Sequence, residues 1–323
     1  MDLIQSANRA APSAIVDCLA RLDPAAPRDY RELAALLACE WSAAPPPRRV
    51  GLAGGQGTGK STLAGILERA CDAVGLRACV LSLDDFYLTQ AERRALAQRV
   101  HPLLVTRGPP GTHDMARCLA AVEALAAAGP PASGAASGES LALPVFDKGL
   151  DDRVGLRSLQ GPFDVIVLEG WCVGARAASE DDLARPMNAL EQDEDPDGRW
   201  RRFVNARLAI DYQPVWDRLD LRILLRAPTL DAVRRWRLEQ EAARPPDRRW
   251  DAPAIDRFVQ HFERITRAML EPGFEGADLF VQLDGAHHVA GLSPLAEAEA
   301  RVSRRLRGGA SPGGESNGGE SRP

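Results

Sequence analysis

The pattern G-x-x-x-x-G-K-[ST] of a phosphate-binding loop occurs in this chain as Gly54-Gly55-Gln56-Gly57-Thr58-Gly59-Lys60-Ser61. A polyphosphate is held by backbone N–H groups that point inward, and glycines leave these groups unobstructed. Lys60 can reach the β- and γ-phosphates, and the Ser61 hydroxyl can be a ligand of Mg²⁺. The predicted nucleotide site consists of Gly54, Gly55, Gln56, Gly57, Thr58, Gly59, Lys60, Ser61 and Thr62.

The residues on either side of this loop predict the strand and the helix that it requires. Val50-Gly51-Leu52-Ala53 is a short apolar run, typical of a buried strand. From Lys60 onward apolar residues recur at helical spacing, at Leu63, Ile66, Leu67, Ala70, Cys71 and Val74. The dipole at the start of this helix favours an anion. We therefore favour a nucleotide site over the alternative, a glycine-rich turn that binds no ligand.

A second polar motif, Asp84-Asp85-Phe86-Tyr87, follows the apolar segment 77–83, which predicts a strand that ends at the same sheet edge as the phosphate loop. Phosphoryl transfer to a hydroxyl needs a carboxylate that orients the alcohol and takes its proton. Asp84 is the first candidate for this base. Asp85 could assist Mg²⁺ or orient Asp84, and we assign Asp85 and Tyr87 to the acceptor site. The alternative is an ordinary turn or helix cap, for which paired aspartates are common.

The segment Asp164-Val165-Ile166-Val167-Leu168 predicts a central parallel strand, and Glu169 follows it directly. An acidic residue at the end of such a strand is typical of a residue that holds the Mg²⁺ shell. We therefore predict Ser61 and Glu169 as metal ligands. A carboxylate that simply ends a strand is the alternative, and Trp171 could either shape the adjacent pocket or belong to the core.

Two further segments carry cations that could meet an anionic acceptor. The loop 107–114 contains Arg107 and His113, and an arginine suits a carboxylate because it can bind it with two hydrogen bonds. The strand predicted at 142–146 delivers Lys148 and Arg153 to the same side. Plain turn chemistry explains the prolines, glycines and aspartate of the first segment but not Arg107 and His113. Ordinary surface charge is the alternative for Lys148 and Arg153.

The helix predicted at 229–243 carries Arg234 and Arg237 on one face. Arginines on a mobile helix can close over the phosphates and neutralise the charge that develops during transfer. A solvated face of arginines and glutamates is an equally good interpretation, since Glu239 and Glu241 follow. His261 lies among apolar residues and is expected to be structural, and the pair 287–288 is assigned no role.

The composition excludes several classes of protein. The chain has 323 residues and a net charge of −5, which argues against a nucleic acid or an anionic membrane as the main partner. Its six cysteines form no C-x-x-C pair, so a zinc site is not expected. No signal peptide and no apolar run long enough to span a membrane are found. We therefore expect a cytoplasmic protein with free thiols.

Strands and helices alternate along the chain, which predicts an α/β fold with a mainly parallel sheet and helices on both faces. Further strands are predicted at 221–225 and 278–283, and further helices at 89–98, 114–128, 254–270 and 293–307. The chain divides into a helical N-terminal extension (1–48), a catalytic domain (49–307) and a disordered tail (308–323). Within the domain we expect a linker-like insertion at 129–141, an acidic surface excursion at 179–199 and a lid at 226–245.

Taken in order, these motifs resemble the plant- and fungal-type D-glycerate 3-kinases and their bacterial relatives, over roughly residues 49–285. That family is similar to the uridine kinase, phosphoribulokinase and pantothenate kinase group of P-loop kinases. The phosphate loop is common to many NTPases, and the motif Asp84-Asp85-Phe86-Tyr87 is specific to the wider kinase group. The loop Arg107–Asp114 and Glu169-Gly170-Trp171 narrow the resemblance to the glycerate kinases. The resemblance implies a P-loop fold, with Asp84 as the base and the Arg234–Arg237 helix as the lid.

The sequence thus predicts an ATP- and Mg²⁺-dependent kinase that phosphorylates a small hydroxy acid, with D-glycerate at O3 as the expected acceptor. A nucleoside or pantothenate is the alternative acceptor within the kinases. Two other classes are a non-catalytic ATP-binding regulator and an NTPase coupled to a partner protein. Asp84 and Asp85 argue against both, since neither needs a base for an alcohol. A GTPase is disfavoured because the Asn-Lys-x-Asp pattern for guanine is absent.

Overall fold

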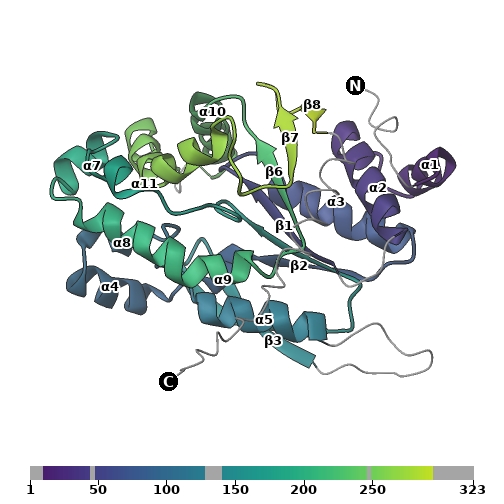
Figure 1. Cartoon of the computed structure of the whole chain (residues 1–323), viewed down its shortest axis with the longest axis horizontal. Helices are drawn as coiled ribbons and strands as arrows, with labels where there is room; N and C mark the ends of the chain where they lie inside the picture. Colours follow the sequence, from purple (N-terminus) through teal and green to yellow (C-terminus); the bar gives the residue numbers. More distant parts are fainter. Residues whose placement is uncertain (1–9, 44–47, 128–139, 246–248, 294–323) are drawn as a thin grey trace, which may run out of the picture.

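The computed structural model describes residues 10–43, 48–127, 140–245 and 249–293 (Figure 1). Its centre is a six-stranded sheet in the order β2-β5-β1-β6-β7-β8. The strands are β1 (Arg48–Gly54), β2 (Ala78–Ser82), β5 (Val165–Gly170), β6 (Leu221–Arg226), β7 (Leu279–Leu283) and β8 (Val289–Leu292). Within these residues β8 is antiparallel to its neighbour and the other pairs are parallel. The predicted α/β class with a mainly parallel sheet is therefore confirmed.

The principal helices also begin and end close to their predicted bounds. They are α3 (Lys60–Ala73), α4 (Gln90–Arg99), α5 (Met115–Ala127), α10 (Leu230–Ala242) and α11 (Ala252–Leu270). The predicted tail 308–323 lies outside the described residues, as does nearly all of the predicted helix 293–307 and most of the linker 129–141. Among the described helices, none combines the length and the apolar character needed to cross a membrane.

The two faces of the sheet carry two separate apolar cores, because successive side chains of a strand point to opposite faces. On β5, Val165 and Val167 contact the core formed with α2 (Arg28–Ser42) and α3. Ile166 and Leu168 contact the other core, which includes α5. Helices on both faces thus bury every residue of β5 (Figure 1), as its continuous apolar sequence predicts.

The N-terminal helices α1 (Pro12–Ala20) and α2 belong to the main core instead of preceding it. Leu33, Leu36 and Leu37 of α2 are fully buried together with residues of α3. The hydroxyl of Tyr30 donates a 2.8 Å hydrogen bond to the carbonyl oxygen of Thr58 in the phosphate loop. The segment predicted as an extension therefore supports the nucleotide loop directly.

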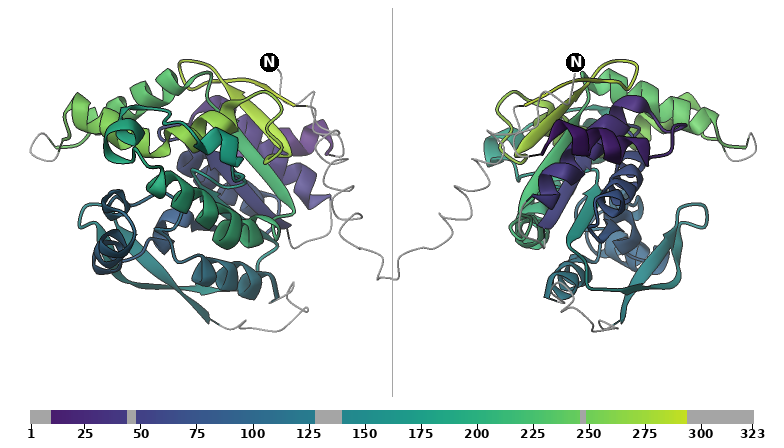
Figure 2. Two further views of the ribbon diagram at one scale, coloured as in Figure 1. Left: turned by 60° about the vertical axis from the view of Figure 1, so that its left-hand side comes forward. Right: turned by 90° about the vertical axis from the view of Figure 1, so that its right-hand side faces the viewer.

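A two-stranded antiparallel hairpin, β3 (Ser140–Asp147) and β4 (Asp152–Gln160), stands apart from the main sheet (Figure 2). The strand predicted at 142–146 is present, but it does not join the parallel sheet, and β4 was not predicted. Val154 and Leu156 of β4 are exposed, so this strand lacks the alternation of buried and exposed residues that marks a half-buried strand. The hairpin turn reaches the acceptor loops described below.

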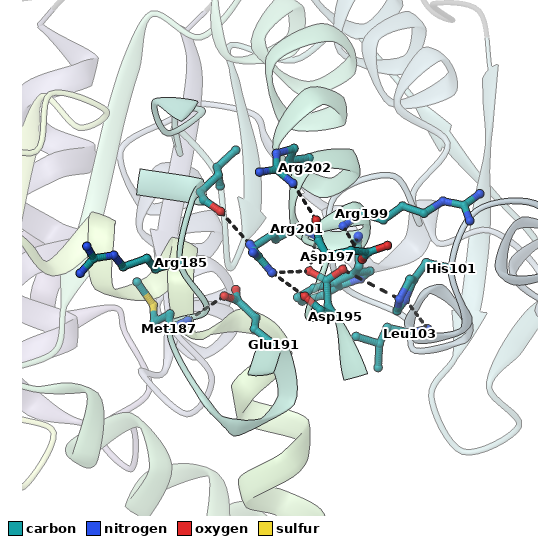
Figure 3. Close-up of polar contacts among 12 residues, drawn as sticks. His101, Leu103, Arg185, Met187, Glu191, Asp195, Asp197, Arg199, Arg201 and Arg202 are labelled. Atoms are coloured by element: carbon teal, nitrogen blue, oxygen red, sulfur yellow. Dashed lines mark hydrogen bonds and ion pairs between the residues drawn. The ribbon is translucent and has the colours of Figure 1, made fainter. Parts of the chain in front are cut away.

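The acidic segment 179–199 was predicted as a solvated excursion. Most of its residues are exposed, but the prediction is wrong for Glu191 and Asp195, which are buried (Figure 3). The segment folds into α6 (Glu180–Leu183) and α7 (Ala189–Glu194) and leads into α8 (Arg199–Arg207). Asp195 is 0% exposed and accepts hydrogen bonds from the backbone N–H groups of Trp200 (2.7 Å) and Arg201 (3.1 Å). Its carboxylate also pairs with the Arg201 guanidinium at 3.0 Å. Arg201 on the next helix pairs with Asp195, and Arg264 on α11 pairs with Glu191, which composition alone does not reveal.

After α8 the chain continues through a π-helical turn (Leu208–Tyr212) and α9 (Gln213–Trp216), for which no element was predicted. Tyr212 and Trp216 are buried in the same core as α5. The hydroxyl of Tyr212 accepts a 3.1 Å hydrogen bond from the backbone N–H of Gly111, so this segment contacts the loop 107–114.

Candidate active site

A cavity of about 360 Å³ opens at the edge of the sheet where β1, β2 and β5 end. This edge is where ligands bind in open α/β sheets. The cavity is lined by Gln56, Gly57, Lys60, Ser61, Asp84, Tyr87, Arg107, Lys148, Trp171, Arg237, Gln240, Arg244, Phe258 and Phe262. The fold thus brings together residues from the phosphate loop, the acidic motif, the loop 107–114, the β3–β4 turn and the helices α10 and α11.

The phosphate loop joins β1 to α3 in a conformation that requires glycine. Gly57 and Gly59 have φ values of +80° and +79°, in the left-handed region. A Cβ at Gly57 would lie 2.6 Å from the Cβ of Trp236, so a side chain there would also clash with α10. Because α3 begins at Lys60, its first N–H groups have no partner within the helix and can bind an anion.

Glu169 is buried at the end of β5, close to the start of α3. Its Oε1 accepts hydrogen bonds from the hydroxyls of Ser61 (3.1 Å) and Ser82 (2.9 Å). Hydroxyl and carboxylate oxygens are the ligands that Mg²⁺ prefers, and that ion usually keeps several waters. Among the described residues no group of three or more His, Cys, Asp or Glu side chains could hold a metal. The hydroxyl of Ser61 and the carboxylate of Glu169 suit Mg²⁺, which uses one or two protein ligands and phosphate oxygens.

Asp84 lines the cavity, where it contacts Lys148 and Tyr87. Its Oδ2 lies 2.6 Å from Nζ of Lys148, and its Oδ1 accepts a 2.7 Å hydrogen bond from the hydroxyl of Tyr87. Burial raises the pKa of this carboxyl, but the charges of Lys148 and Lys60 and the hydrogen bonds outweigh it and hold the pKa at about 2. Asp84 is therefore ionised and can accept a proton from an alcohol.

Asp85 does not line the cavity. Its carboxylate lies against the β3–β4 hairpin, where it accepts a 3.4 Å hydrogen bond from the backbone N–H of Phe146 and pairs with Arg157 at 3.6 Å. Burial raises the pKa of Asp85, and the charges of Asp84 and Glu169 add to this effect. The geometry favours Asp84 over Asp85 as the base.

Of the four residues predicted to meet an anionic acceptor, Arg107 and Lys148 line the cavity, and His113 and Arg153 do not. The guanidinium of Arg107 pairs with Asp151, which sequence reasoning missed. Arg153 is turned toward the backbone and donates a 2.9 Å hydrogen bond to the carbonyl oxygen of Tyr87. Each of the two predicted cationic segments therefore contributes one residue to the cavity, Arg107 from the loop 107–114 and Lys148 from the β3–β4 turn.

His113 lies behind Tyr87, with ring centroids 4.5 Å apart, and is only 6% exposed. Its Nδ1 is 2.5 Å from the hydroxyl of Tyr212, and its Nε2 has no hydrogen-bond partner among the described residues. Burial lowers the pKa of His113 to about 4. The structure therefore places a neutral histidine under the site, where it supports Tyr87, and not a cation in the cavity wall.

The two predicted lid arginines are separated. Arg237 lines the cavity, whereas Arg234 is turned to α11 and pairs with the buried Glu263 at 3.2 Å. Gln240 and Arg244 also line the cavity, although only Arg234 and Arg237 were predicted. Gln240 lies three residues after Arg237 on the same face of α10, so this signal was present in the sequence, whereas Arg244 lies beyond the end of the helix at Ala242.

His287, to which the sequence assigned no role, contacts the phosphate loop. Its Nε2 lies 2.8 Å from the carbonyl oxygen of Gly57 and must donate to it, since a carbonyl only accepts. The ring stacks on Trp236 with centroids 4.0 Å apart. No local motif marks this residue, because the contact joins segments 230 residues apart. His261 is buried on α11 and does not line the cavity.

None of the sequence profiles of known protein families matches the chain. The uncharacterized kinase mug58 of Schizosaccharomyces pombe is 33% identical over 208 residues, which are 61% of this chain and 71% of that protein. The chloroplastic D-glycerate 3-kinase of Arabidopsis thaliana is 30% identical over 213 residues, or 62% of this chain. This second match spans only 42% of the plant enzyme's length.

Among solved structures, the D-glycerate 3-kinase of Cryptococcus neoformans var. grubii is similar to this chain, with a TM-score of 0.60 and 25% sequence identity. The alignment covers 87% of this chain and 97% of the fungal one. The similarity therefore extends over most of this chain and nearly all of the fungal one.

Proposed function

The chain belongs to the D-glycerate 3-kinase-like family of P-loop kinases, and we propose that it transfers the γ-phosphate of ATP to the O3 hydroxyl of D-glycerate. The observation that carries this proposal is the position of Asp84 in one cavity with Lys60 and Ser61. An ionised carboxylate beside a phosphate loop is what transfer to an alcohol requires. A nucleotide-binding regulator would have no use for it.

In this reaction the start of α3 and Lys60 bind the phosphates of ATP. Asp84 orients the acceptor hydroxyl and takes its proton as the alcohol oxygen bonds to the γ-phosphorus. The bond from that phosphorus to the bridging oxygen of ADP breaks. Arg237 and Arg244 line the same cavity, where they can neutralise charge on the transferred group. We assign residues 226–245 to a lid for this reason.

We further propose that Ser61 and Glu169 hold Mg²⁺. The two side chains are already within hydrogen-bond distance of each other, and the Ser82 hydroxyl donates to the same oxygen of Glu169 as Ser61 does. When bound, the ion supplies neutralisation of the phosphate charge. Ser61 contributes a neutral ligand and Glu169 a charged one, which agrees with the hard oxygen donors that Mg²⁺ prefers.

The acceptor is proposed to be an acid because two cations, Arg107 and Lys148, line that side of the cavity. The carboxylate of glycerate would bind between them, with the reacting hydroxyl toward Asp84. We place the reaction in the cytoplasm, since the six cysteines are buried free thiols, as expected in a reducing compartment.

Steady-state release of ADP tests the proposal, with D-glycerate, glycerol, uridine and pantothenate as acceptors. We expect D-glycerate to have the highest kcat/KM. Glycerol should be about ten- to a hundredfold poorer, because it offers no carboxylate with which Arg107 and Lys148 could form charged hydrogen bonds. Faster turnover of uridine or pantothenate would overturn the acceptor and leave the kinase. A Lys60→Ala variant that kept the wild-type rate would overturn the kinase as well.

A further inference from the structure

The proposed base is fully engaged before any acceptor is present. Lys148 holds Oδ2 of Asp84 at 2.6 Å, and Tyr87 holds Oδ1 at 2.7 Å. Tyr87 is buried, whereas the Lys148 side chain is 61% exposed and sits on the turn between β3 and β4. The ammonium group can therefore leave Asp84 by a change of rotamer, without any disturbance of the core.

A second cation of the acceptor side is paired in the same way by the same turn. The guanidinium of Arg107 pairs with Asp151, and Asp151 is itself held by the buried Arg93 at 2.6 Å. Both Arg107 and Lys148 are thus matched to carboxylates of the protein. The two carboxylates differ in the proposed reaction, because Asp151 takes no part in proton transfer, whereas Asp84 must accept the proton of the hydroxyl.

An acceptor that carries a carboxylate competes with Asp84 for the ammonium of Lys148. A neutral alcohol or water cannot compete, because neither offers a negative charge to replace the one that the ammonium leaves. The identity of the acceptor therefore decides whether Asp84 keeps its cation. Against the effect of burial, the charges of Lys148 and Lys60 and the hydrogen bonds from Lys148 and Tyr87 hold the pKa of Asp84 at about 2, so Asp84 is a weak base while the pair is intact.

We propose that Lys148 is a specificity switch that masks Asp84 until the carboxylate of the acceptor draws the ammonium away. This inference rests on the proposed function, because it takes Asp84 as the base of the transfer to a hydroxy acid. Once Lys148 has moved, Asp84 accepts the hydroxyl proton, the alcohol oxygen bonds to the γ-phosphorus, and ADP leaves with the electron pair of the broken bond. The enzyme would then distinguish a hydroxy acid from a neutral alcohol in kcat as well as in KM.

A second consequence concerns water, which competes with the acceptor for the γ-phosphate. With no carboxylate in the site, Lys148 stays on Asp84, and water has no free base to deprotonate it. The ion pair therefore also limits hydrolysis of ATP when the acceptor is absent. Removal of the ammonium should release this restraint.

The test compares Lys148→Met and Lys148→Arg with the wild type. Arg94→Met is the matched control, since it removes one positive charge from an exposed position of α4. Two quantities are measured for each protein: ATP hydrolysis without an acceptor, and the ratio of kcat with D-glycerate to kcat with glycerol. In Lys148→Met we expect hydrolysis to rise about tenfold and the kcat ratio to fall about tenfold, as for loss of one charged hydrogen bond.

Lys148→Arg should restore both quantities toward the wild-type values, and Arg94→Met should leave them unchanged. Unchanged or slower hydrolysis in Lys148→Met, together with an unchanged kcat ratio, would overturn the switch, even if the KM for glycerate rose. Failure of the wild type to phosphorylate D-glycerate would instead reject the proposed acceptor, and the hydrolysis measurement would still test the masking of Asp84.

Discussion

The carboxylate of Glu241 lies 2.7 Å from the guanidinium of Arg237, which lines the cavity. Glu241 is only 1% exposed, and it also pairs with Arg244 at 3.0 Å and accepts a hydrogen bond from the backbone N–H of Trp250. One buried acid thus fixes both cavity-lining arginines of the proposed lid. The sequence suggested instead that Glu241 could belong to a solvated face.

Replacement of Glu241 by glutamine should loosen Arg237 and Arg244 and so weaken the binding of ATP. We expect the KM for ATP to rise about tenfold, equivalent to about 1.4 kcal/mol, with a smaller effect for Glu241→Asp. Glu239→Gln is the control, since that side chain is exposed and pairs only with Arg235 in the described structure. Equal KM values for Glu241→Gln and Glu239→Gln would contradict a positioning role.

Exchange of Asp84 for asparagine should lower kcat roughly 10²- to 10⁴-fold, because the amide cannot take the proton of the alcohol. The KM for ATP should stay near its wild-type value, since Asp84 lies on the acceptor side. Asp85→Asn is the matched comparison and should have a smaller effect, because Asp85 faces the hairpin. A silent Asp84→Asn with a severe Asp85→Asn would show that the two roles are reversed.

Some residues of the candidate site could be predicted from the sequence, and others could not. The phosphate loop, Asp84 and Glu169 lie next to strands and helices with clear apolar patterns, so both their type and their sheet edge could be inferred. Asp151 and Glu241 could not be placed in this way. Each is buried or paired through contacts that depend on tertiary packing, and an acidic residue in isolation is most often solvated.

The buried pair of Asp195 and Arg201 should contribute strongly to stability. Asp195→Asn keeps the shape but leaves the Arg201 guanidinium buried without its counter-charge, a loss of about 3–5 kcal/mol. Glu180→Gln removes the acid of an exposed pair with Arg202 and should cost about 1 kcal/mol or less. Urea denaturation gives the free energy of unfolding of the two variants, and we expect a much larger loss in Asp195→Asn than in Glu180→Gln. Similar losses in both would indicate that segment 179–199 is solvated after all.

The hairpin β3–β4 and the segment 179–216 mark the limit of prediction for the fold. The β4 strand exposes Val154 and Leu156, so its pattern does not distinguish a strand from a loop. The acidic segment looked like a solvated loop because Glu191 and Asp195 find their partners, Arg264 and Arg201, only in the folded chain. Local patterns place elements well, but they do not reveal which charges are buried.

Two buried histidines should make the fold sensitive to mild acid. Burial lowers the pKa of His113 and of His261 to about 4, whereas the unfolded side chain titrates at about 6.5. The unfolded chain therefore binds more protons between these values. The stability that the neutral histidines contribute is present above pH 6.5 or so, and it is lost as the pH falls toward about 4.

Thermal unfolding between pH 7 and pH 4.5 measures this effect. We expect Tm to fall as the pH is lowered, and we expect His261→Phe to flatten the fall. His288→Asn serves as the control, because that side chain is mostly exposed. Identical pH dependence in the wild type and in His261→Phe would show that His261 does not titrate as its burial requires.

The most direct test of the proposed reaction is phosphorus NMR of the product formed from ATP, Mg²⁺ and D-glycerate. We expect a single phosphorylated acid with the phosphate on O3, formed in equal amount with ADP by the wild type and at a greatly reduced rate by Asp84→Asn. A phosphate on O2 would contradict the placement of the acceptor between Arg107, Lys148 and Asp84. Consumption of ATP with no phosphorylated glycerate would contradict the proposed function itself.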